Sequence, residues 1–135
     1  MFTPVNFTEG QLVELPFSTG ETVVKGGAVV CDTDGYYIMG GSATAVDVYH
    51  VAMVDAVTTA DGQMILCVRT LPRTVFEVDT DNNPARTDVG TLADLATVQT
   101  LNPDASANDI FFIEDIVGPV ANKKVRGFFV DSERS

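Results

Sequence analysis

The sequence TVVKGGAVVCDTDGYYIMGGSATAVDVYHVAMVDAVTTADGQMILCVRTLPRTVF occupies residues 22–76 of the chain. Short apolar runs at 28–30, 36–39, 46–54 and 64–68 alternate here with glycine-bearing turns at almost regular intervals. Such spacing is typical of strands joined by hairpin turns. We therefore predict an all-β fold, mainly antiparallel, in the form of a β-barrel or sandwich with at most one short helix.

The run 46–54 is apolar on both of its faces, since every second residue counted from either Val46 or Asp47 is mostly hydrophobic. Successive side chains of a strand point to opposite faces, so this pattern predicts a central strand that is covered on both sides. The dipeptide Asp61-Gly62 then favours a turn into a strand at 64–69. We expect these two strands to pair as a hairpin.

The remainder of the chain predicts three further strands, at 74–79, 110–117 and 124–130. We expect Phe76 to point inward, and the phenylalanines of the last two strands to close the core: Phe111, Phe112, Phe128 and Phe129. Leucines and a valine recur about every third residue between 91 and 101, with Thr91 as a possible N-cap. This segment is the one helix candidate, although 97–101 could equally be a strand.

The length of 135 residues fits one domain. We divide the chain into an N-terminal arm, 1–16, and a single β domain, 17–135. Exposed Phe2 and Phe7 would be a liability on a free monomer, so the arm is expected to pack on a neighbour or across its own sheet. With Val5 they form the first candidate partner-binding group. The alternative is an ordinary edge strand.

The charge excludes one class of partner. Nineteen acidic residues against eight basic ones give a formal net charge of −11, which repels phosphate backbones. We therefore expect no nucleic-acid partner. A basic cluster of Lys123, Lys124 and Arg126 is the second candidate partner-binding group, because it could pair with carboxylates of a neighbouring subunit. Alternatively, it protects the edge of the last strand against aggregation.

No long apolar run and no basic N-terminal start are present, so we expect neither a membrane span nor a signal peptide. The two cysteines, Cys31 and Cys67, lie in apolar runs and are expected to be buried free thiols. They would form a disulfide only if their strands were neighbours. Two thiols alone cannot complete a tetrahedral zinc site.

No catalytic residue is assigned. The single histidine, His50, lies in the middle of an apolar run, where a structural role is more common than catalysis. The segment 79–88 begins like a calcium loop with alternating Asp79, Asp81 and Asn83, but Pro84 stands where such a loop has glycine. A solvated turn is therefore the better interpretation, and we expect no metal or other cofactor.

Four segments resemble the small capsid decoration (cement) proteins of tailed phages. In that family a strand, a Lys-Gly turn and a second strand are followed by a Val-Ala-Met strand and then by an Asp-Gly turn with an apolar strand. The matching segments here are VVKGGAVV (23–30), VAMVDA (51–56), DGQMILCV (61–68), and an ending in which 113–117 leads to KVRGFF (124–129). The resemblance does not account for 79–88 or 91–101.

The resemblance implies a β-barrel-like module that oligomerises, often as a trimer. It also implies a position on the outer surface of the virion, at junctions between major capsid protein subunits, where the module stabilises the expanded shell. The partners would be the major capsid protein and other copies of the chain. Two alternatives remain open: another virion structural protein, such as a head fibre base, minor coat or tail component, or a small β-barrel ligand-binding protein or enzyme with a deep pocket near His50.

Overall fold

The computed structural model describes residues 1–40, 48–71 and 74–130. These residues form thirteen strands and three 3-10 helices, and the predicted all-β class is confirmed. The elements are, in chain order, β1 (Thr3–Pro4), η1 (Glu9–Gln11), β2 (Leu12–Phe17), β3 (Thr22–Val23), β4 (Ala28–Cys31), β5 (Tyr37–Met39), β6 (His50–Ala52), β7 (Ala56–Val57), β8 (Gln63–Arg69), β9 (Phe76–Thr80), η2 (Arg86–Asp88), β10 (Leu92–Thr97), β11 (Thr100–Asn102), β12 (Phe111–Ile116), η3 (Val120–Asn122) and β13 (Lys124–Phe129).

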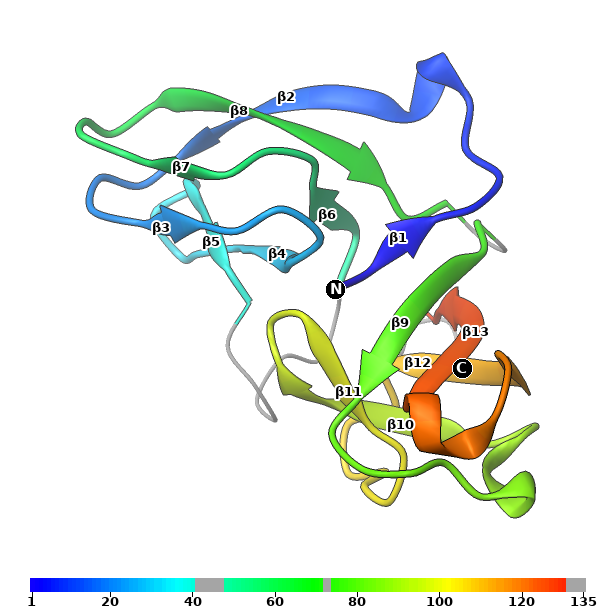
Figure 1. The fold of residues 1–135 in the computed structure, drawn as a ribbon. Helices are drawn as coiled ribbons and strands as arrows, with labels where there is room; N and C mark the ends of the chain where they lie inside the picture. Colours follow the sequence, from blue (N-terminus) through cyan, green and yellow to red (C-terminus); the bar gives the residue numbers. More distant parts are fainter. Residues whose placement is uncertain (41–47, 72–73, 131–135) are drawn as a thin grey trace.

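The first half of the chain forms a closed barrel in the order β2-β5-β4-β6-β8 (Figure 1). Its longest pairing is antiparallel, between β2 and β8, from Leu12 opposite Val68 to Phe17 opposite Gln63. A short parallel pairing of β2 with β5, at Phe17 and Tyr37, closes the barrel. Strands β3 and β7 form a separate two-stranded sheet.

The second half forms a six-stranded sheet in the order β1-β9-β11-β10-β12-β13. Strand β9 also pairs with β13, so the pairings from β9 through β11, β10, β12 and β13 return to β9. The N-terminal strand β1 is added to β9, with Thr3 opposite Glu77 and Pro4 opposite Phe76. In Figure 1 this sheet lies below the barrel, and β1 lies between the two halves.

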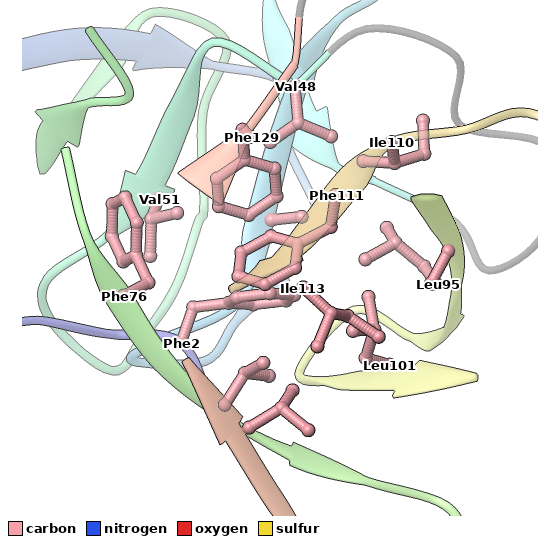
Figure 2. Packing of buried hydrophobic residues seen from close by; sticks show 14 of the residues in the cluster. Phe2, Val48, Val51, Phe76, Leu95, Leu101, Ile110, Phe111, Ile113 and Phe129 are labelled. Carbon is pink, nitrogen blue, oxygen red and sulfur yellow. The ribbon is translucent and has the colours of Figure 1, made fainter. Parts of the chain in front are cut away.

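The two halves share one core. A single cluster of buried side chains includes Val51 and Val68 from the barrel together with Phe76, Leu101 and Phe111 from the second sheet. Figure 2 shows the rings of this cluster packed against one another. A second cluster, which includes Leu15, Phe17, Ile65 and Cys67, belongs to the barrel. Burial of apolar area on this scale is the main favourable term in folding.

The predicted central strand is confirmed in position but not in length. Strand β6 covers only His50–Ala52, and it pairs with β4 on one side and β8 on the other. The predicted pairing with the strand at 64–69 is present, since Val51 lies opposite Val68 on β8. The two strands do not form a simple hairpin, because β7 lies between them in the chain and pairs with β3. Gly62 at the turn has φ +87°, a conformation that glycine adopts without the Cβ penalty of other residues. Residues 46 and 47 lie outside the described part of the chain.

The predicted helix at 91–101 is wrong. Its residues form the antiparallel pair β10 and β11, joined by a turn at Val98 and Gln99. The physical reason is a tertiary contact, because the buried Asp94 carboxylate accepts backbone N–H bonds at 2.8–2.9 Å from Ala107, Asn108 and Asp109. Tertiary contacts of this kind override a weak local preference for helix.

The predicted core role of the paired phenylalanines is only half correct. Phe111 and Phe129 lie opposite each other on β12 and β13 and are buried. Phe112 and Phe128 are the next pair, so the alternation of a strand turns them to the other face, where their rings stack at 5.1 Å and remain partly exposed.

Candidate docking surface

Three apolar side chains near the N-terminus are exposed although the chain around them is ordered by hydrogen bonds. Met1 is 39%, Val5 54% and Phe7 37% exposed, and we call these three residues the N-terminal patch. The Val5 N–H donates to the carbonyl oxygen of Val75 at 2.8 Å, and the N–H of Val75 donates to the Asn6 side chain at 2.8 Å. The patch is therefore held on the second sheet.

A pocket of about 210 Å³ lies beside the N-terminal patch. Residues 1–4 and Phe7 line it from the N-terminal segment, and Lys25, Gly26, Ala52 and Met53 line it from the barrel. The walls are mostly apolar, and Lys25 is the only residue with a basic side chain among those that line the pocket. Such a hollow can receive an apolar side chain of a partner.

Phe2 lines the pocket but is not exposed within one chain, which corrects the expectation that its side chain is exposed. It is 1% exposed, and its ring packs on Phe76, Phe111 and Phe129 at centroid distances of 6.5, 5.7 and 4.8 Å. The N-terminal segment thus packs across its own sheet, one of the two arrangements expected. The predicted arm boundary at residue 16 also falls inside β2.

The basic cluster lies on β13 and just before it. Lys124 approaches Asp79 at 3.7 Å, and the same carboxylate accepts a hydrogen bond from the N-terminal ammonium group at 2.8 Å. That hydrogen bond is the main reason why the pKa of Asp79 lies below its usual value, and Lys124 adds to the effect. Lys124 is therefore brought next to Met1, whereas Lys123 and Arg126 are exposed.

His50 is packed against an aromatic ring. It lies opposite Arg69 on the adjacent strand, and its ring is 5.5 Å from that of Tyr37 in an edge-to-face arrangement. Burial and, to a smaller extent, the charge of Arg69 lower the pKa of His50 to about 4. The imidazole is therefore neutral at pH 7, and it does not line the pocket beside the N-terminal patch.

The two cysteines are free, and they differ in exposure. Cys67 is buried as expected, and burial raises its pKa to about 12. Cys31 is exposed, which corrects the expectation of two buried thiols. Cys31 is the last residue of β4, where it lies opposite Tyr37.

The acidic segment 79–88 forms a hydrogen-bonded turn. The Asp88 carboxylate accepts from the Ala85 N–H at 2.7 Å at the start of η2, and the side chain of Asn82 donates to Asp104. Within residues 1–40, 48–71 and 74–130, no three or more His, Cys, Asp or Glu side chains are grouped so that they could hold a metal ion. In the same residues, no helix has the length and apolarity needed to cross a membrane.

Val5 and Phe7 are exposed as the sequence predicts, but nothing in the sequence pointed to Lys25 and Met53, which line the pocket. Met53 follows β6, and the length predicted for that strand placed it in a covered position. A glycine-bearing turn with φ +77° at Gly26 brings Lys25 to the pocket. The presence of that turn is visible in the sequence, but its position beside the N-terminus is not.

Comparison with known proteins finds no matching family model, no matching curated protein and no matching solved structure.

Proposed function

We propose that this chain is a non-enzymatic capsid decoration protein, which binds the outside of a phage head at junctions between major capsid protein subunits and stabilises the shell. The observation that carries the proposal is the position of the segments that resemble the decoration family. They coincide with β3 and β4, with β6 and β7, with β8, and with β12 and β13. The resemblance therefore follows the strands that build both halves of the molecule.

The N-terminal patch and its pocket supply the contact surface in this proposal. Val5 and Phe7 expose apolar area that a partner would bury, and burial of apolar area contributes about 25 cal/mol per Å². The patch lies on ordered backbone, so little conformational entropy is lost when it docks. The contact that one copy makes through Val5 and Phe7 is weak by itself. Many copies on one shell, linked as oligomers such as trimers, would bind with high avidity.

The test mixes the purified protein with bare expanded heads and measures co-sedimentation. The wild-type chain is expected to sediment with the heads. Replacing Val5 and Phe7 together by serine is expected to weaken binding by about tenfold or more, since apolar anchors dominate interface energies. Deletion of residues 1–7 is a poorer test, because it also removes Phe2 from the core.

The matched control is Val120→Ser. Val120 is 47% exposed, but it lies in η3 and does not line the pocket. It should leave co-sedimentation unchanged. If Val120→Ser weakens binding as much as the Val5/Phe7 double substitution, the patch is not the contact surface. If the wild-type chain stays in the supernatant with well-formed expanded heads, the decoration role is wrong.

A further inference from the structure

Residues 1–4 form a plug, because their strand pairing and the contacts of Phe2 join them to distant parts of the chain. Phe2 is buried against Phe76, Phe111 and Phe129, as Figure 2 shows. Its N–H donates to the carbonyl oxygen of Gly26 at 2.8 Å, and β1 pairs with β9. We call these four residues the N-terminal plug, and the site formed by β9, Gly26 and the three phenylalanines the socket.

The plug is joined to the barrel by an exposed connector. All six residues from 5 to 10 are exposed, and two of them are the apolar Val5 and Phe7. Six extended residues span about 20 Å. The connector is therefore long enough to carry the plug away from its own socket without disturbing β2, which begins at Leu12.

The socket is complementary to residues 1–4 of this sequence, which occupy it in the structure. Each copy of the chain carries both the plug and the socket, so a second copy can supply the same ring packing, the same backbone bond to Gly26 and the same pairing with β9. Exchange of an identical element costs little at equilibrium, since the interactions that break within one copy form again between two copies.

Concentration decides between the two arrangements. Once the bonds of Val5 and Asn6 to Val75 are broken, the short connector holds the plug near its own socket at an effective concentration in the range of about millimolar. Docking within one chain therefore dominates in dilute solution. Exchange becomes competitive when copies are held next to one another at comparable local concentration.

We infer that the N-terminal plug is an exchangeable element, and that residues 1–4 of one copy insert into the socket of a neighbouring copy when the chains are concentrated. The partner for this surface is a second copy of the chain. The inference does not depend on the decoration role, because it concerns the purified chain alone and is tested without heads.

The test uses a disulfide between the plug and the socket. Thr3 lies opposite Glu77, and directly opposed residues of an antiparallel pair have Cα atoms about 4.5 to 5.5 Å apart, which suits a disulfide. Thr3→Cys and Glu77→Cys are made in separate chains, each with Cys31→Ser to remove the exposed native thiol. The two proteins are mixed at about millimolar concentration, where exchange competes with the closed form, and then oxidised.

A covalent dimer between the Thr3→Cys and Glu77→Cys chains is the expected product on a non-reducing gel. The matched control replaces Thr3→Cys by Thr19→Cys, which is also an exposed threonine but lies between β2 and β3. We expect about tenfold more dimer from the Thr3 mixture than from the Thr19 mixture, because only the former has a specific paired geometry. Equal yields at every concentration would overturn the inference.

A second measurement does not rely on cysteines. Deleting Asn6 and Phe7 shortens the connector by about 7 Å, which hinders docking within one chain but not the insertion of the plug into another copy. Light scattering at matched protein concentration is expected to show a larger mass for this variant than for the wild-type chain. A monomer with a lowered thermal midpoint would contradict the inference, because the plug would then have no alternative socket.

Discussion

The ring of Phe2 lies 4.8 Å from the ring of Phe129, with an angle of 46° between their planes. The second residue of the chain thus packs on the last strand of the described structure. This contact makes the N-terminus part of the core. It separates Phe2, which stabilises the fold, from Val5 and Phe7, which are exposed and available to a partner.

The first prediction concerns this separation. Phe2→Ala should lower the free energy of unfolding by about 3 to 5 kcal/mol, because it leaves a cavity among three aromatic rings. Phe7→Ala should change it by less than about 1 kcal/mol, since Phe7 is 37% exposed. Denaturant unfolding of both variants checks this. Similar losses for the two variants would contradict the assignment of Phe2 to the core.

The second prediction concerns Gly127 on β13. A Cβ atom added there would collide with the carbonyl oxygen of Phe112 on β12, so the two strands can approach each other only with glycine at this position. Gly127→Ala should destabilise the fold by about 1 to 3 kcal/mol or more. Gly10→Ala is the control, because its nearest neighbour would be Thr8 Oγ1 at 3.9 Å. Thermal unfolding that shows equal midpoints for the two variants would count against the β12–β13 pairing.

The third prediction concerns pH. The pKa of His50 falls from 6.5 to about 4 in the folded protein, so between these values the unfolded chain binds more protons and stability decreases as the pH falls. A complete shift of this size corresponds to about 3 kcal/mol. Because the ring is partly exposed, solvent screening reduces this contribution. We expect the free energy of unfolding to fall by about 1 to 2 kcal/mol between pH 7 and pH 4.

His50→Gln should flatten this pH dependence when unfolding free energies are measured across the same range. The pKa values of Asp79 and Asp115 lie below the ordinary value of 3.8, so their own stabilising contributions are lost only as the pH falls below about 5, and this loss is the same in the wild-type chain and in the variant. A wild-type slope that persists unchanged in the variant would exclude His50 as its source.

The fourth prediction concerns thiol reactivity. Cys31 is exposed, whereas Cys67 is buried and its pKa is raised to about 12. At pH 8 a thiol reagent should therefore modify Cys31 alone in the folded protein and both cysteines after denaturation. Mass spectrometry of alkylated peptides identifies the sites. Rapid labelling of Cys67 under native conditions would show that the barrel core opens.

Local patterns in the sequence are sufficient to predict that β6 and β8 of the barrel pair with each other. The Asp61-Gly62 turn and the apolar runs beside it predict the pairing of β6 with β8, because turn chemistry and alternation act over a few residues. The alternation does not show where a strand ends. β6 ends at Ala52, whose N–H donates to the carbonyl oxygen of Gly27 and whose carbonyl oxygen accepts from the N–H of Gly26.

Contacts between distant residues could not be predicted in the same way. The spacing of Leu92 and Leu95 suits a helix, but Asp94 is fixed by the N–H groups of 107–109, and no local pattern reports that contact. Apolarity near the N-terminus likewise indicated a contact surface without showing which residues would be buried. The pairing of β1 with β9 shows the difference, because it accompanies the burial of Phe2 and leaves Phe7 exposed.

Electron microscopy of bare expanded heads mixed with the purified protein would show directly whether and where the chain binds a capsid. We expect added density on the outer surface, at junctions between major capsid protein subunits, with Val5 and Phe7 facing the shell. Density confined to a fibre, a tail or another single site, or heads that remain bare at saturating protein, would contradict it.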